Sequence, residues 1–259
     1  MTLFDKFLRI RELGIFSIIV VFVIIAAIID PRFMTFDSWR AVFLAIPLIL
    51  VMAMGQMMVI ICRHVDISIG SILAFSAIVI GLLYIQFPGL SLWLSLIITA
   101  FVGLVMGLIN GYIVTRFNVH SIIVTLGTLS LYRGLVFIVS GGRQIDRNDI
   151  PEHVVSFSQT SFFFSIPAIL IFSAIIVIIT HLVMRHSVLG REIYATGSNP
   201  VAAHLKGINV TKVTLFCFGV CGMLAGVAGL FYASRFGYVN PGVTGVGIEF
   251  IVIAGVIIG

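Results

Sequence analysis

Two ionisable residues stand out because long apolar stretches surround them. Asp66 lies directly before a run without charge from Ile67 to Thr115, and Arg133 lies inside a further apolar stretch. An arginine or aspartate at the centre of a membrane helix costs about 2.5–3.5 kcal/mol on insertion scales. Each of these side chains therefore needs a structural or a functional reason for its position.

Asp66 allows two interpretations, which are compatible with each other. Its carboxylate can cap a helix that begins at Ile67 by accepting a backbone amide near Ser68 or Ile69. Alternatively, the segment is a helix break that lines a solute route, where freed backbone groups are tolerated because they face a cavity.

Arg133 and several uncharged polar residues present a similar choice. The guanidinium of Arg133 can reach the outer face, anchor a helix break or act at a gate. The amides of Gln56 and Asn110 and the hydroxyls of Thr125 and Thr128 can bond to the hydroxyls of a solute or to neighbouring helices. The predicted translocation pathway consists of Asp66, Ser68, Gly70, Asn110, Thr125, Thr128 and Arg133.

The sequence contains no motif for enzymatic chemistry. The patterns H-E-x-x-H and G-x-S-x-G are absent, and the histidines lack the spacing of metal ligands. The cysteines, Cys62, Cys217 and Cys221, form neither a zinc pattern nor a disulfide framework, so we expect them to be packing residues. The phosphate-binding loop G-x-x-x-x-G-K-[ST] is also missing. We therefore predict a protein without catalytic residues, metal or cofactor, which cannot hydrolyse ATP by itself.

The longest polar segment with helical potential spans residues 185–212. Asn199 followed by Pro200 is a good helix start, because proline is tolerated in the first turn, where its missing amide is not needed. Residues 200–206 are then predicted to form a short helix on the membrane surface, which Gly207 closes as a C-terminal cap.

We expect Ala202 and Ala203 to be exposed on this short helix. Small exposed side chains would suit a shallow groove in a partner protein. On composition alone, however, an ordinary basic loop at the cytoplasmic face is the preferred explanation of the segment.

The elements that must position these residues are membrane helices. Of the 259 residues, 60% are hydrophobic and 10% are charged, whereas soluble domains carry about 25% charged residues. A bilayer core of about 30 Å needs about 20 apolar residues per helix. The predicted fold class is therefore all-α, a polytopic transmembrane helical bundle that forms a single domain over residues 1–259. The predicted spans cover 13–29, 41–62, 67–85, 92–115, 120–140, 162–184 and 213–233, and an eighth, incomplete span begins around Ile248.

The positions of lysine and arginine predict a cytoplasmic N-terminus, because cytoplasmic loops are enriched in these residues. The first span is predicted to be retained, since Asp30, Pro31 and Arg32 follow it instead of a cleavage site. The basic residues are spread between apolar runs, so the net charge of +5 reflects topology rather than a nucleic-acid partner. The nine cations of the predicted inner segments are Lys6, Arg9, Arg11, Arg63, Arg116, Arg185, Arg191, Lys206 and Lys212. The predicted outer segments hold Arg32, Arg40, Arg143, Arg147 and Arg235, accompanied by Asp30, Asp37, Asp146, Asp149 and Glu152.

Small residues at a spacing of four occur on two of the predicted spans. Gly103, Gly107 and Gly111 form two overlapping G-x-x-x-G units, and Gly222 and Gly226 form another. Such units let helix backbones approach closely, so both spans are expected to pack against protein. The alternative is that glycine is simply common in membrane helices.

Three motifs resemble those of a known family of transporters. The polar segment follows the pattern G-R-x-x-x-A-x-G-x-N-x-x-A-A-x-x-x-G-I, which is similar to the coupling loop of ribose-type ABC permeases. Residues 65–71 resemble the G-I-D-L-S-V-G-S motif of that family, and residues 125–142 resemble its T-L-G-T…Y-R-G…S-G-G segment. The residues that match the coupling-loop pattern are Gly190, Arg191, Ala195, Gly197, Asn199, Ala202, Ala203, Gly207 and Ile208.

The resemblance implies the membrane permease subunit of an ATP-driven importer for sugars or sugar-like solutes in the bacterial inner membrane. Its implied partners are cytoplasmic ATPase subunits that grip residues 199–208, a second permease copy or paralogue, and a periplasmic solute-binding protein. Residues 141–152 are most similar to the group that includes autoinducer-2 and rhamnose permeases. Members of the family have a ten-span architecture and continue beyond the position of Gly259, so we expect the chain to be truncated relative to the family.

Two other functions stay open from the sequence. A secondary transporter driven by an ion gradient would need a relay of intramembrane ionisable residues, for which Arg133, Glu249 and Asp66 are the candidates. A membrane scaffold without transport activity would need none of them.

Overall fold

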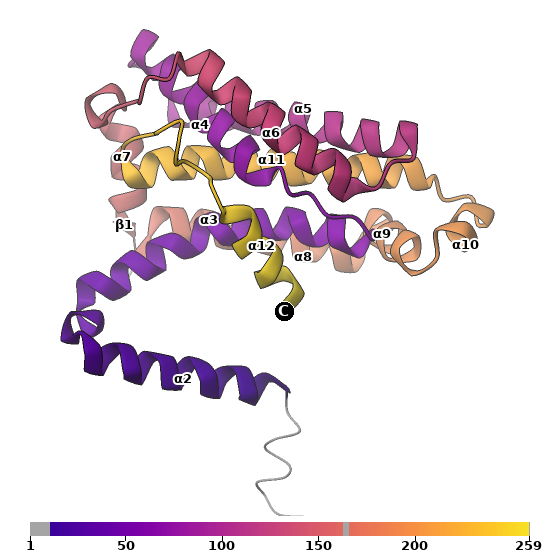
Figure 1. Cartoon of the computed structure of the whole chain (residues 1–259), viewed down its shortest axis with the longest axis horizontal. Helices are drawn as coiled ribbons and strands as arrows, with labels where there is room; N and C mark the ends of the chain where they lie inside the picture. Colours follow the sequence, from indigo (N-terminus) through magenta and orange to yellow (C-terminus); the bar gives the residue numbers. More distant parts are fainter. Residues whose placement is uncertain (1–10, 163–165, 259) are drawn as a thin grey trace, which may run out of the picture. The chain divides into compact units, whose positions relative to one another are not determined.

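The computed structural model describes residues 11–162 and 166–258, most of which lie in helices (Figure 1). Two of the predicted inner cations, Lys6 and Arg9, lie outside the described residues. The chain divides into two compact units, residues 1–45 and 46–259. Each unit is described by itself below.

The described part of the first unit holds a helix, a short turn and the start of a second helix. Helix α2 (Arg11–Ile29) is followed by the 3-10 turn η1 (Pro31–Met34), and α3 (Phe36–Ile61) begins in this unit. The Asp30 carboxylate accepts the amide of Arg32 at 2.9 Å and so caps the turn. The Thr35 carbonyl oxygen accepts the Trp39 amide at 3.2 Å, which starts α3 earlier than the predicted residue 41.

The second unit is a bundle of long helices (Figure 1). Its membrane-length helices after α3 are α4 (Ile69–Gln86), α5 (Leu92–Phe117), α6 (Ser121–Ser140), α8 (Ala168–His186) and α11 (Val210–Phe236). Shorter elements connect them or follow them: η2 (Arg147–Asp149), α7 (Glu152–Gln159), α9 (Val188–Ser198), α10 (Pro200–Leu205) and α12 (Ile248–Ile258).

The prediction of a polytopic helical bundle is confirmed. By length and composition, six of the described helices can cross a membrane, and the shorter apolar helices Phe16–Ile29 and Ile248–Ile258 match the first and eighth predicted spans. The sixth predicted span begins late, because β1 (Ser161–Phe162) and β2 (Ile166–Pro167) pair antiparallel before α8. Pro167 then fixes an extended backbone at the start of that helix.

Helix α11 forms the centre of the bundle and packs mainly against α5 and α4. In its most apolar window 78% of the residues are buried, compared with 28% in α5. Gly103 and Gly222 touch backbone to backbone, and a Cβ atom on either glycine would collide with the carbonyl oxygen of the other. The predicted close crossing of these glycine-rich spans is thereby confirmed.

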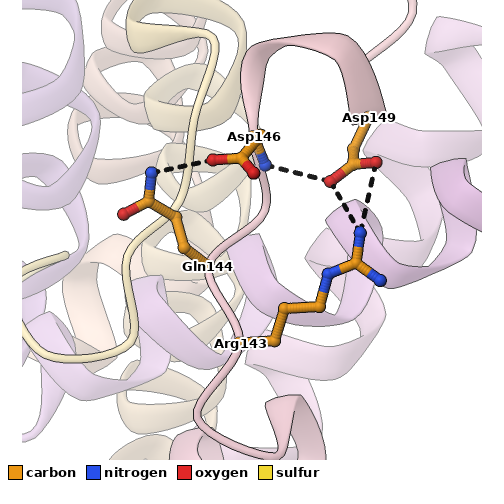
Figure 2. A network of polar contacts seen from close by, with 4 residues as sticks. All are labelled: Arg143, Gln144, Asp146 and Asp149. Atoms are coloured by element: carbon orange, nitrogen blue, oxygen red, sulfur yellow. Dashed lines mark hydrogen bonds and ion pairs between the residues drawn. The ribbon is translucent and has the colours of Figure 1, made fainter.

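The segment before α7 is held by polar contacts (Figure 2). The guanidinium of Arg143 pairs with Asp149 at 3.3 Å, and Asp149 also accepts the amide of Asp146 at 3.1 Å. Gln144 donates to the Asp146 carboxylate at 3.0 Å. Together with the pair between Arg147 and Glu152, these contacts place both ion pairs of the described residues in a predicted outer segment.

Candidate functional site

The backbone leaves the helical path between α3 and α4, at residues 62–68. Arg63 adopts a left-handed conformation with φ of +66°, and the amide of His64 returns to the carbonyl oxygen of Val59 at 3.0 Å. Helix α4 starts at Ile69, two residues later than predicted. Because Asp66 and Ser68 are fully buried, the polar groups of this break need partners within the protein.

The Asp66 carboxylate is the centre of a buried hydrogen-bond network. Its Oδ1 atom accepts the amide of Ser68 at 2.8 Å and the hydroxyl of Ser68 at 2.7 Å. Asn110, on α5, donates from Nδ2 to Asp66 Oδ2 at 3.2 Å and to Ser68 Oγ at 2.8 Å. Tyr132, on α6, donates its hydroxyl to Asn110 Oδ1 at 3.1 Å and to the Met106 carbonyl oxygen at 2.9 Å. Asn110 thus links the break that holds Asp66 to both α5 and α6.

The environment of Asp66 acts on its pKa in two directions. Burial raises the pKa of the carboxyl above its ordinary value, whereas the donors on Ser68 and Asn110 lower it. The amide that it accepts belongs to Ser68, as expected for a capping role, although Ser68 itself is the residue before the first turn of α4. Asp66 therefore organises the entry into α4.

The backbone of the break is paired from two neighbouring helices. With its amide oriented to pair both polar atoms, Gln56 accepts the Asp66 amide at 3.2 Å and donates to the Asp66 carbonyl oxygen at 3.3 Å. On α6, Ser121 Oγ accepts the Val65 amide at 3.1 Å, and Thr125 bonds to the Val65 carbonyl oxygen at 3.4 Å. Thr125 belongs to the predicted pathway, whereas Ser121 carried no signal in the sequence beyond its position at a helix start.

The remaining pathway candidates do not join this network. Thr128 bonds within its own helix, to the Thr125 carbonyl oxygen at 3.4 Å. Arg133 donates from Nη1 to the carbonyl oxygen of Thr244 at 2.6 Å, so it anchors the nonhelical segment before α12. The predicted set thus separates into one group around Asp66 and another beside the start of α12, while Thr128 belongs to neither.

Gly70 lies beside the same segment as Arg133. A Cβ atom at Gly70 would collide with the Gly245 carbonyl oxygen and with Oε2 of Glu249. Glu249 is buried, its Oε1 accepts the amide of Gly247 at 3.3 Å, and its Oε2 has no hydrogen-bond partner among the described residues. The segment around Gly245 can therefore pack this closely against α4 only because Gly70 has no side chain.

The polar segment 185–212 forms two consecutive helices. Ser187 caps α9 by accepting the amide of Gly190 at 3.0 Å, and Asn199 caps α10 by accepting the amide of Ala202 at 3.1 Å. Helix α10 ends at Leu205, and Gly207 follows with φ of +83°. The predicted start of the short helix is confirmed, whereas the helix ends one residue earlier than predicted, with Lys206 as its C-cap.

The predicted exposure of α10 was partly wrong. Ala203 is 3% exposed, because it lies on the side of the helix that packs against the protein. The outward side instead presents Val201, 71% exposed, and Leu205, 81% exposed, which are four residues apart and share one helix face. An apolar pair, rather than two alanines, is therefore what α10 offers to its surroundings.

Arg63 connects this segment to the break in the bundle. Its Nε donates to the carbonyl oxygen of Gly197 and its Nη2 donates to that of Ser198, both at the end of α9. Gly197 lies so close to the Ile61 carbonyl oxygen that a Cβ atom would collide with it. In the sequence, Arg63 is only one of the predicted inner cations. Its partners lie 134 and 135 residues later, so only the tertiary fold brings them together.

Other residues of the coupling-loop pattern shape the start of the segment. Gly190 is buried against the carbonyl oxygens of Val183 and Met184, which leaves no room for a side chain. Arg191 is exposed and bonds from Nη1 to the His186 carbonyl oxygen at 3.4 Å. These contacts fold α9 back onto the end of α8.

The three cysteines are buried and free. Cys62 and Cys217 approach each other to 3.5 Å between their Sγ atoms, at the point where the end of α3 meets α11. They occupy the core, as expected for packing residues.

These features define a multi-pass helical membrane protein in which a break between two helices is bonded to the end of α9. Residues 40–259 match the family described as the permease component of the branched-chain amino acid transport system, and the chain belongs to that family. The sequence resemblance to ABC permeases is thereby confirmed.

Relatives from three Yersinia species share one description. The chain is 33% identical over 232 residues to the autoinducer 2 import system permease protein LsrC of Yersinia enterocolitica. The aligned region covers 90% of this chain and 63% of the relative. It is 32% identical to the proteins of the same name from Yersinia pseudotuberculosis and Yersinia pestis, with 64% of each relative covered. The chain thus spans less than two thirds of the length of these relatives. No solved structure matches the chain.

Proposed function

We propose that this chain is the membrane permease subunit of an ATP-binding-cassette importer for a sugar or sugar-like solute. Membership of a permease family and similarity to autoinducer 2 import permeases support the proposal. The observation that carries it is the bond from Arg63 to the end of α9, because it links a surface helix to a buried helix break. Movement of the surface helix would therefore reach the bundle directly.

The partners follow from what the chain lacks and what it exposes. The sequence has no phosphate-binding loop, so ATP hydrolysis belongs to separate cytoplasmic subunits. We assign their docking site to residues 199–208, where Val201 and Leu205 face outward. A second permease subunit completes the pore, and a periplasmic solute-binding protein delivers the solute. This arrangement requires a cytoplasmic N-terminus in the bacterial inner membrane.

The transport cycle is alternating access. Closure of the ATPase pair pulls on α10, and α9 transmits the displacement through Arg63 to residues 62–68. Because hydrogen bonds through Asn110 join this break to α5 and α6, the break and both helices respond together. The ATPase drives the change through its different contacts with the permease before and after ATP binding.

The test uses the permease assembled with its ATPase and binding protein in proteoliposomes. Ala202→Arg and Gly207→Trp are expected to insert normally but to abolish solute-stimulated ATP hydrolysis. Phe87→Glu, which changes an exposed apolar residue in the loop between α4 and α5, is the control and should retain stimulation. Normal stimulation in both surface-helix variants would refute the docking assignment. Uptake that survives ATP depletion but collapses with an uncoupler would instead indicate an ion-driven transporter.

A further inference from the structure

An apolar groove of about 530 Å³ lies among α5, α8 and α11 of the second unit. Its walls include Leu104 and Leu108 from α5, Ile176 and Val183 from α8, and Phe216 and Met223 from α11. Among the described residues that line it, Thr180 alone has a polar side chain. Since all three helices are long and apolar enough to cross a bilayer, the groove lies at membrane depth and borders hydrocarbon rather than water.

The groove exists because α11 carries a glycine where α5 carries two leucines. A Cβ atom on Gly219 would lie 3.0 Å from Leu108 Cδ2 and 3.2 Å from Leu104 Cδ1. Helix α8 packs against α7, β2 and α9, which lie before and after it in the chain. Its Ile179 side chain, which lines the groove, is 56% exposed. The hollow is therefore open to the surrounding lipid.

One mouth of the groove is basic. Helices α5 and α11 run antiparallel, since Gly103 contacts Gly222 whereas Gly111 contacts Phe218. The end of α5, with Arg116, therefore lies at the same end of the bundle as the start of α11, with Lys212. Lys212 precedes Phe216 by one turn on the same helix face, so it stands in line with the groove.

Arg116 and Lys212 are both exposed, and neither takes part in an ion pair within the part of the chain that the structure describes. Polar headgroups border the hydrocarbon at the ends of membrane helices. A negatively charged group at this mouth would therefore meet two uncompensated cations.

We propose that the groove binds one acyl chain of an anionic phospholipid, whose phosphate lies beside Lys212. From Phe216 to Met223 the groove extends over roughly 10 Å of helix length. A single acyl chain has the same apolar character as the walls.

Selectivity for the headgroup is expected to come from charge. The acyl chain is in hydrocarbon whether or not it enters the groove, so apolar burial alone does not favour binding. Each lysine or arginine near a surface attracts an anionic lipid by about 1 kcal/mol, which corresponds to roughly fivefold in affinity. The fit of the acyl chain beside Gly219 and the charge of Lys212 thus contribute separately to lipid binding.

The experiment is native mass spectrometry of the full chain in mild detergent, with added phosphatidylglycerol or phosphatidylcholine of identical acyl chains. The wild-type chain should retain phosphatidylglycerol more strongly. Lys212→Gln should weaken this retention roughly fivefold and leave phosphatidylcholine unchanged. Lys206→Gln, which removes an exposed lysine after α10, is the matched control and should have no effect.

A second pair of variants tests the groove itself. Gly219→Leu should abolish retention of both lipids, whereas Gly134→Leu, at a glycine with open space around it, should retain them. Val220→Trp fills the same groove and replaces Gly219→Leu if that variant is not monodisperse. Equal retention of the two lipids by the wild-type chain, or unchanged retention in a well-folded groove-filling variant, would overturn the proposal. So would a photo-crosslinker at Val220 that captures a polypeptide instead of a lipid in native membranes.

Discussion

The guanidinium of Arg63, at the end of α3, donates a hydrogen bond from Nε to the carbonyl oxygen of Gly197, at the end of α9. A second donation reaches Ser198. Because the backbone of Gly197 also touches that of Ile61, the surface helices have little freedom to move without the end of α3. The proposed coupling route begins at this contact.

Substitution of Arg63 tests that route. Arg63→Gln removes the charge-assisted donations, each worth about 1.5–3 kcal/mol. We expect solute-stimulated ATP hydrolysis to fall at least about tenfold, since 1.4 kcal/mol corresponds to that factor, while the ATPase still co-purifies. Arg185→Gln, at an exposed arginine near the end of α8, is the matched control and should couple normally. If Arg63→Gln transports as well as the control, force does not pass through this residue.

The network around Asp66 makes a prediction about stability. Asn110→Leu leaves Asp66, Ser68 and Tyr132 without a shared partner, and an unpaired buried polar group costs about 1–3 kcal/mol. The thermal unfolding midpoint of the detergent-solubilised chain should therefore fall.

Tyrosine variants calibrate that loss. Tyr132→Phe removes a single donor and should cost less, about 0.6 kcal/mol by the average for membrane proteins. Tyr112→Phe, at an exposed tyrosine on α5, should leave the midpoint unchanged. An Asn110→Leu variant as stable as the Tyr112 control would show that the network adds nothing to stability.

The crossing of α5 and α11 predicts a strong dependence on side-chain size. Gly103→Ile places a branched side chain against the backbone of Gly222, which cannot yield as a flexible side chain would. Overpacking usually costs about 1–3 kcal/mol of folding free energy, and we expect the upper end, about 3 kcal/mol, for this variant. Gly127→Ile, at a glycine of α6 with open space around it, should be tolerated. Similar yields of folded protein for the two variants would contradict a tight crossing.

The sequence predicts the helical bundle well because its signals are local. Charge-free runs of membrane length mark the spans, and the spacing of Gly103 and Gly222 with their neighbours marks a close crossing. The cap at Asn199 is equally local, since its side chain bonds three residues ahead. Each of these features depends on residues within one or two turns.

The unpredicted features depend on contacts between distant residues. Ala203 is buried because of what lies beneath α10, and no local pattern distinguishes it from Ala202. The partners of Arg63 and Asp66 come from other helices, so the sequence offers only their isolated polarity. Arg133 likewise lies apart from the Asp66 group because it bonds to the carbonyl oxygen of Thr244, which is far away in the sequence.

The location and partner of α10 can be measured with one introduced thiol. The native cysteines are buried, whereas Leu205 is 81% exposed, so Leu205→Cys adds a single accessible site. In the permease without its ATPase, an impermeant thiol reagent should label this site in inside-out vesicles and not in intact cells. In the full complex, a bifunctional reagent should link the site to the ATPase. Labelling from outside intact cells, or the lack of any ATPase crosslink, would contradict the proposed coupling between a nucleotide-driven partner and the helical bundle.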